Sequence, residues 1–280
     1  MTTAAEPPIA DLLALIEKTW GYRILRPLQQ PAMQAMLDGR DSLVVLPTGG
    51  GKSLCYQAPA LLRSLHGQGP TVVISPLIAL MKDQVDSLRS LGIAAAQLDS
   101  SLSADERRQV AADLRAGRLH LLFMSPERLV GGGASLHGML RDAGVQAVAI
   151  DEAHCISHWG HDFRPEYRQL AHLREILPGT SVHAFTATAT TQVRKDIAAQ
   201  LDLQDPELLV GNFDRPNLTY RILPRRDIYR QIEEVLARHP GEAGIIYAMR
   251  RRDVDDLSAA LAENKALGRT VMGYHAGMTA

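Results

Sequence analysis

The feature that most constrains the fold is a regular alternation of short apolar runs with longer amphipathic segments. Some of the runs, such as LLFM and AVAI, are apolar throughout, as strands are when helices cover both faces of a parallel sheet. The alternation predicts an α/β domain with a doubly wound parallel sheet. Seven runs are expected to form its strands: Ser42–Leu46, Thr71–Ser75, Ala94–Leu98, Leu119–Met124, Ala147–Ile150, Val182–Phe185 and Leu208–Val210.

The segments between these runs have the spacing of helices that pack on a sheet. Ser103 and Glu106 stand three residues apart, the arrangement of a capping box at the start of a helix. The helices expected from the pattern are Leu77–Leu91, Ala104–Ala116, Tyr167–Leu177 and Thr191–Leu201.

Composition excludes several classes of protein. The 280 residues include 30 basic and 31 acidic side chains, and 46% are apolar, which is enough for a packed core and argues against disorder. No apolar run approaches the ~20 residues of a membrane span, and the N-terminus lacks the pattern of a secretory signal. Two distant cysteines, Cys55 and Cys155, cannot by themselves form a zinc site. We expect a cytoplasmic protein without zinc or membrane contacts, in which any nucleic-acid binding is concentrated in a groove.

A second, shorter series follows a cluster of turn residues at 212–217, which we interpret as a linker. Strands are expected at Leu218–Leu223, Gly244–Tyr247 and Thr270–Tyr274, with helices at Ile228–Arg238 and Asp253–Asn264. Because 280 − 217 leaves only 63 residues, this series is expected to be a truncated second domain.

Residues 43–53, LVVLPTGGGKS, combine an apolar strand, a glycine-rich loop and Lys-Ser at the start of a helix. Glycines allow successive N–H groups to converge on a phosphate, and the helix N-terminus adds partial positive charge. Leu46 stands where the strict P-loop pattern has glycine, so the loop is a variant. The candidate phosphate-binding residues are Thr48, Gly49, Gly50, Gly51, Lys52 and Ser53.

Two adjacent carboxylates, Asp151 and Glu152, follow the apolar run 147–150 and open the sequence DEAH. Ligands of open α/β sheets bind at the carboxyl ends of the strands. Asp151 and Ser53 could therefore hold Mg²⁺, while Glu152 could orient and deprotonate an attacking water. Lys52, Asp151 and Glu152 are the candidate catalytic residues.

These motifs together resemble the superfamily 2 helicases and, more narrowly, the RecQ family of DNA helicases. The resemblance also rests on TAT at 186–188, SPLIAL at 75–80, GYRILRPLQ at 21–29, LPTGGGKSLCYQ at 46–57 and CISHWGHDFRPEY at 155–167. It implies a RecA-like domain at 33–211, an adenine-reading helical segment at 1–32, and part of a second RecA-like lobe at 218–280.

The same resemblance implies roles for further residues. Gln29, with Tyr22 and Arg26, would read the adenine, and Thr186 and Thr188 would link the nucleotide site to DNA. His154 would bridge the two sites, while Cys155 is expected to be a small buried residue. An aromatic loop would sense single-stranded DNA through stacking and phosphate contacts, and a second group would touch the DNA backbone. The loop residues are Trp159, His161, Phe163 and Arg164, and the backbone group is Ser75, Lys82, Gln84, Ser125, Pro126 and Arg128.

The second lobe resembles the family less closely. Its recognisable segments are GIIY at 244–247 and YHAG at 274–277. Ala248 and Arg250 depart from the usual residues, whereas Arg251 keeps a basic position. The family's arginine finger and its later zinc-binding and DNA-binding domains are expected beyond residue 280.

The resemblance implies an ATP-dependent 3′–5′ DNA helicase of RecQ type, acting in DNA repair or recombination with ATP and Mg²⁺ on single-stranded and partly duplex DNA. The isolated chain is expected to unwind DNA weakly or not at all. Two alternatives remain open: an RNA helicase of the same superfamily, and a non-hydrolysing DNA-binding module gated by ATP.

Overall fold

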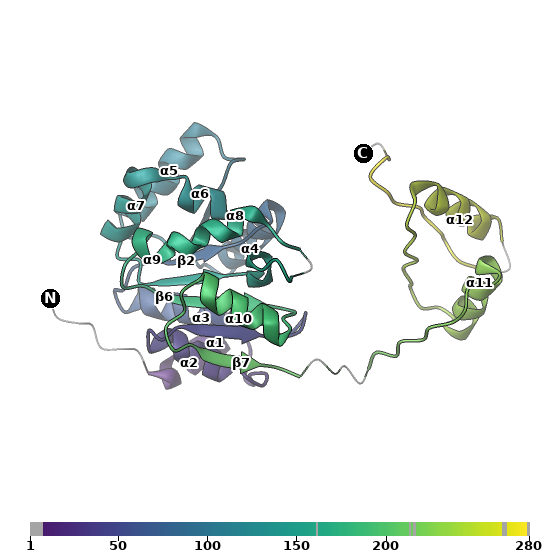
Figure 1. Cartoon of the computed structure of the whole chain (residues 1–280), viewed down its shortest axis with the longest axis horizontal. Coiled ribbons are helices and arrows are strands. Elements are labelled where there is room, and N and C mark those ends of the chain that lie inside the picture. Colours follow the sequence, from purple (N-terminus) through teal and green to yellow (C-terminus); the bar gives the residue numbers. More distant parts are fainter. Residues whose placement is uncertain (1–7, 161, 213, 215–216, 265–267, 279–280) are drawn as a thin grey trace. The chain divides into compact units, whose positions relative to one another are not determined.

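The computed structural model describes residues 8–160, 162–212, 214, 217–264 and 268–278. The chain divides into two units, Met1–Asp214 and Arg215–Ala280. Within the described residues, every strand belongs to the first unit (Figure 1). None of the helices described combines the length and the apolar character that crossing a bilayer requires.

The first unit is built on a parallel sheet of seven strands in the order β3-β4-β2-β5-β6-β1-β7. Each predicted run forms a strand, with ends that differ by no more than two residues, so the predicted α/β class is confirmed. The strands are β1 (Ser42–Val45), β2 (Thr71–Ile74), β3 (Ala95–Leu98), β4 (Leu121–Met124), β5 (Ala147–Ile150), β6 (Ser181–Thr186) and β7 (Glu207–Val210).

Helices cover both faces of this sheet. Alternate strand residues point to opposite cores, so Leu43 and Val45 pack in one cluster while Val44 packs in the other. One face carries α1 (Ile9–Trp20), α2 (Gln29–Leu37), α3 (Lys52–Leu65) and α4 (Ile78–Ser90). The other carries α5 (Ala104–Arg115), α6 (Pro126–Val130), α7 (Gly133–Asp142), α8 (Pro165–Arg168), α9 (Leu173–Ile176) and α10 (Thr191–Gln200).

Two helix predictions have different outcomes. The capping box is confirmed: Ser103 Oγ accepts from Glu106 N at 3.3 Å, and Glu106 Oε2 accepts from Ser103 N at 2.8 Å. The single helix expected at 167–177 is wrong, because the 3₁₀ turn η2 (Gln169–His172) separates α8 from α9. Four of the five buried residues between 167 and 177 recur every third position, which matches the three residues per turn of a 3₁₀ helix. They are Tyr167, Leu170, Leu173 and Ile176.

The second unit contains α11 (Ile228–Arg238) and α12 (Arg251–Glu263), close to the predicted helices. The strand predictions at 218–223, 244–247 and 270–274 are wrong, since none of these described segments is a strand. A helix satisfies its hydrogen bonds internally, whereas a strand needs a paired neighbour. The apolar side chains of these segments, such as Tyr247 and Tyr274, lie exposed.

One carboxylate ties together the amino ends of three strands. Asp41 is buried immediately before β1. Its Oδ1 accepts from Val182 N of β6 at 2.8 Å, and its Oδ2 accepts from Gln204 N, ahead of β7, at 2.7 Å. Arg174 also pairs with this carboxylate.

Replacing Asp41 should destabilise the first unit strongly. We expect Asp41→Ala to lower the free energy of unfolding by about 3–5 kcal/mol, because Arg174 and two backbone N–H groups lose their acceptor. Urea unfolding measures the loss. The matched control is Asp38→Ala, whose exposed pair with Arg40 should contribute less than about 1 kcal/mol. Equal losses in the two variants would contradict a special role for Asp41.

Candidate functional site

The glycine-rich loop lies between β1 and α3, at the carboxyl end of the sheet. Gly49 and Gly51 have φ values of +77° and +78°, which favour glycine. Gly50 N donates to Pro47 O at 2.8 Å, and a Cβ on Gly50 would lie 2.8 Å from the same oxygen. Lys52 Nζ donates to Leu46 O at 3.2 Å, so the lysine folds back over the loop. Thr48 and Gly49 are exposed at its tip.

Gln29 joins the upstream segment to this loop. Its side chain is buried, and its Oε1 accepts from Arg26 N at 2.8 Å. Its Nε2 lies 3.2 Å from Gly51 O and 3.4 Å from Gly50 O, so it can donate to these carbonyls. A Cβ on Gly51 would meet Nε2 at 2.3 Å, a contact that further restricts this position to glycine. Tyr22 is exposed, so only Gln29 of the three predicted adenine readers is buried at the loop.

Asp151 is buried in a polar cluster beyond β5. Tyr56 Oη lies 3.4 Å from Asp151 Oδ2 and 2.7 Å from Gln84 Oε1. Glu152 N donates to Asp151 Oδ1 at 3.0 Å, and Tyr167 Oη donates to Asp151 O at 2.9 Å. Gln84 thus belongs to the carboxylate cluster. Tyr56 and Tyr167 are not among the residues predicted for the site, because their role follows from contacts with residues distant in sequence.

This environment favours the protonated form of Asp151. Burial, with a further contribution from the negative charge of Glu152, raises the pKa of Asp151 to about 6. The Ser53 hydroxyl interacts with the Tyr56 phenol, so both candidate Mg²⁺ ligands border one tyrosine. Their hydroxyl and carboxylate oxygens suit a hard cation, and such a cation would favour the ionised carboxylate.

His154 connects the segment after β5 to the carboxyl end of β6. Its Nδ1 lies 2.8 Å from Thr186 Oγ1 and 3.3 Å from Glu152 Oε2. Thr188 N in turn donates to Thr186 Oγ1 at 3.3 Å. Glu152 has φ +47°, a conformation uncommon for a residue with a side chain, at the start of the 3₁₀ turn η1 (Ala153–Ile156).

The aromatic loop is anchored at one end and open at the other. Trp159 is 71% exposed. Phe163 is half-buried and stacks on His158, with ring centroids 3.8 Å apart. Arg164 pairs with Asp162 at 3.1 Å and donates to Pro76 O at 3.0 Å, which ties the loop to the segment after β2. His161 lies outside the described residues.

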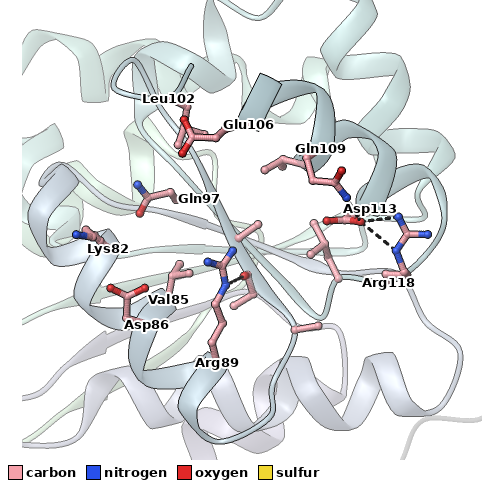
Figure 2. A pocket seen from close by; sticks show the side chains of 15 residues that line it. Lys82, Val85, Asp86, Arg89, Gln97, Leu102, Glu106, Gln109, Asp113 and Arg118 are labelled. Atoms are coloured by element: carbon pink, nitrogen blue, oxygen red, sulfur yellow. Dashed lines mark hydrogen bonds and ion pairs between the residues drawn. The ribbon is translucent and has the colours of Figure 1, made fainter. Parts of the chain in front are cut away.

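The candidate DNA-backbone residues are distributed over several segments. Ser75 is buried, and its Oγ has no hydrogen-bond partner among the described residues. Ser125 caps α6 by accepting from Arg128 N at 3.3 Å, with Pro126 as the first helical residue. Lys82 is exposed on α4 and lines a cavity of about 570 Å³ between α4, β3 and α5 (Figure 2).

One group within the described part of the chain has the donor atoms of a metal site. His154, Cys155 and Asp162 place three possible ligand atoms within 4.8 Å of one another. Burial raises the pKa of the Cys155 thiol to about 12, so the thiol is protonated at neutral pH. Asp162 is already paired with Arg164. These contacts account for the cluster without a cation.

The residues singled out in the second unit lie near the start of α12. Arg250 is the N-cap and Arg251 the first helical residue. A Cβ on Gly277 would lie 3.1 Å from a terminal nitrogen of Arg251, so the YHAG segment passes close to this helix. Ala248 lies in the segment that precedes it.

Residues 26–197 match the family model described as DEAD/DEAH box helicase. The chain is 44% identical to the ATP-dependent DNA helicase RecQ of Pasteurella multocida over 95% of this chain and 41% of that protein. It is 40% identical to the ATP-dependent helicase SGS1 of Saccharomyces cerevisiae over 90% of this chain and 18% of that protein. The resemblance to RecQ helicases is confirmed, and the chain spans about two fifths or less of the length of these relatives.

Solved structures agree on the fold. The crystal structure of the DUF1998 helicase MrfA matches with a TM-score of 0.70 and 19% identity, over 94% of this chain and 42% of that chain. The Mycobacterium smegmatis helicase Lhr, solved with ssDNA and AMP-PNP, matches with a TM-score of 0.63 and 21% identity, over 95% and 38% of the two chains. These similarities establish the RecA-like architecture.

The raised pKa of Asp151 predicts a dependence of stability on pH. The folded-state value of about 6 exceeds the ordinary 3.8, so the folded state binds this proton more tightly. The carboxyl group therefore costs stability as pH rises from about 4 to 6, and the cost persists above pH 6. Asp151→Asn should remove it and stabilise the protein at pH 8 by on the order of 2 kcal/mol.

Thermal unfolding of Asp151→Asn and the wild type at pH 8 and pH 4.5, without nucleotide or divalent cation, measures this effect. The advantage of the variant should be largest at pH 8 and fall to roughly a third of that value at pH 4.5, because the unfolded-state carboxyl group is already largely ionised there. A variant that is less stable than the wild type at pH 8 would show that the buried carboxylate is favourable as it stands.

Proposed function

Because the chain belongs to the DEAD/DEAH box helicase family, we propose that it is the ATP-binding part of a RecQ-type DNA helicase. In this proposal, ATP hydrolysis drives 3′-to-5′ movement along single-stranded DNA and duplex separation in repair or recombination. The observation that carries the proposal is the 2.8 Å contact between His154 and Thr186. It joins the DEAH segment to the TAT segment beside Glu152.

The loop after β1 is proposed to hold the triphosphate of ATP. Backbone N–H groups of residues 48–51 would surround the phosphates, and Lys52 would exchange its contact with Leu46 O for a phosphate oxygen. Gln29 is proposed to read the adenine, with Tyr22 and Arg26 completing that surface. Its contacts with the loop carbonyls place the proposed reader beside the phosphate site.

Ser53 and Asp151 are proposed to hold Mg²⁺, which when bound supplies positive charge beside the phosphates. Glu152 is proposed as the residue that orients and deprotonates the attacking water. The contacts of His154 with Glu152 and Thr186 give a direct route by which the end of β6 can alter the position of this carboxylate.

The aromatic loop and the neighbouring strand ends are proposed to contact DNA. Exposed Trp159 suits stacking on a nucleobase, while Phe163 and Arg164 anchor the other end of the loop. His161 is part of the proposed loop. The residues proposed to contact the sugar-phosphate backbone of DNA are Ser75, Lys82, Ser125, Pro126 and Arg128. Gln84 is proposed instead to hold the Asp151 cluster.

We also propose the domain assignment: an adenine-reading segment at 1–32, a RecA-like domain at 33–211, a linker at 212–217 and part of a second RecA-like lobe at 218–280. The rate of phosphate release from ATP tests the proposed helicase function when it is measured without nucleic acid, with single-stranded DNA and with RNA.

Stimulation of this rate by DNA supports the proposal. Stimulation by RNA alone would favour an RNA helicase, and ATP binding without any turnover would favour a gated binding module.

Lys52→Ala should abolish productive binding of MgATP, because the loop amides alone do not balance the charge of a triphosphate. Isothermal titration calorimetry with a non-hydrolysable ATP analogue measures the loss of affinity, which should exceed tenfold (~1.4 kcal/mol). Lys18→Ala, on α1, provides a control lysine outside the loop. Undiminished affinity in Lys52→Ala would exclude this loop as the phosphate site.

Thr186→Val should impair coupling rather than nucleotide binding. The buried hydroxyl that contacts His154 is lost, while the shape of the side chain is kept. We expect DNA-stimulated phosphate release to fall roughly tenfold with little change in the dissociation constant of MgATP. Thr71→Val, which alters a buried threonine at the opposite end of the sheet, is the control. Parallel losses of affinity and stimulation in Thr186→Val would indicate a purely structural role.

A further inference from the structure

A shallow hollow of about 540 Å³ on the outer side of α5 and α6 is lined by four arginines and two alanines. The lining residues are Ala104, Arg107, Arg108, Ala111, Arg115 and Arg128. Among these described residues none is acidic, although the whole chain carries a formal charge of −1. Positive charge is therefore concentrated here far above the average of the chain.

The hollow follows one stripe of α5, which adjoins α6 in Figure 1. Ala104, Arg108, Ala111 and Arg115 recur at intervals of four, three and four residues, so they share one helix face. The alanine methyl groups leave room between the arginines. A ligand can therefore approach the helix closely while the guanidinium groups reach it from both ends.

The arginines of the hollow are incompletely satisfied by the protein. Arg115 is exposed and makes no hydrogen bond or ion pair with the described residues. Arg128 Nε is buried and lacks an acceptor in the described part of the chain. Arg108 pairs only with Asp105, and both side chains are largely exposed, so that pair contributes little. Arg107 donates to Leu102 O at 2.9 Å, which orients it along the helix.

The opposite side of α5 is different. There the cavity shown in Figure 2 is lined by side chains of both signs. Arg118 is held by Asp113 Oδ1, with its Nε at 3.0 Å, and Arg89 Nε donates to Ala95 O at 2.8 Å. These arginines are already occupied by protein groups, so of the two described surfaces that flank α5, the α5–α6 hollow is the one with an excess of available positive charge.

We propose that this hollow binds the phosphate backbone of a DNA strand and carries it from Arg128 onto α5. The inference rests on the proposed function, in which Arg128 contacts DNA. Arg108 and Arg115 are two helical turns apart, about 10 Å along the axis, so one phosphate cannot bridge them. Successive phosphates of one DNA strand can contact both arginines. Arginine suits this role because its planar guanidinium group can donate two hydrogen bonds to the oxygens of one phosphate.

The test measures the binding of a fluorescein-labelled oligothymidine of 20 nucleotides to the 280-residue chain. Fluorescence anisotropy reports this binding at KCl concentrations from 25 to 200 mM. Arg108→Gln/Arg115→Gln removes two charges from the hollow. Arg89→Gln/Arg118→Gln removes two charges from the cavity side and is the matched control. Circular dichroism establishes that each variant is folded.

We expect the hollow variant to bind roughly three- to tenfold more weakly at 100 mM KCl. The slope of log affinity against log salt should decrease by about 1.4, for two lost contacts with a single strand. The control should stay close to the wild type in both measures. Inorganic phosphate at matched ionic strength should not displace the oligonucleotide more than chloride does.

Equal affinities and slopes for the two variants, with a wild type that binds DNA, would overturn this inference and leave the proposed function intact. Specific displacement by inorganic phosphate would also overturn it, in favour of a site for a single anion. Failure of the wild type to bind DNA at all would instead contradict the proposed function on which the inference rests.

Discussion

The candidate site depends on the parallel pairing of β1 with β6 and of β6 with β5. Val45 lies opposite Thr186, and Ile150 lies opposite Ala184, so the three strands end at one edge of the sheet. The residues at the carboxyl ends of these strands are far apart in sequence, yet the register brings them together, so that His154 can contact Thr186. A shift of one residue would turn Thr186 to the opposite face and remove it from His154.

At this edge of the sheet the site buries a carboxyl group, that of Asp151, in a position where burial disfavours its charged form. Asp151 is surrounded by Tyr56, Gln84 and Tyr167, and burial holds its proton until about pH 6. Protein interiors disfavour such a group unless a cation or a donor offsets the charge. On the proposed function, a Mg²⁺ bound beside Asp151 would offset this charge. Asp41 provides the contrast, because its buried carboxylate is fully engaged by protein donors.

Local patterns predicted the first unit well because apolar strands and phosphate-loop glycines are properties of contiguous residues. Contacts between distant segments were not predictable in this way: no local pattern joins Gln29 to the glycine loop or Tyr56 to Asp151. The helix expected at 167–177 failed through a three-residue spacing that resembles a helical stripe. The strands expected after residue 217 failed because an apolar run predicts a strand only when a partner completes its hydrogen bonds.

On the proposed function, the nucleotide site and the DNA-binding surface are joined by residues that contact both. His154 contacts Glu152 on the nucleotide side and Thr186 at the end of β6, while Arg164 reaches from the aromatic loop to Pro76 after β2. Trp159 is left exposed on a loop whose other end is fixed. A DNA base that stacks on Trp159 would thus move a segment directly continuous with η1, and Glu152, which immediately precedes η1, has a strained conformation. On the proposed function, the shortest path from DNA to the hydrolytic carboxylate is this turn of 3₁₀ helix.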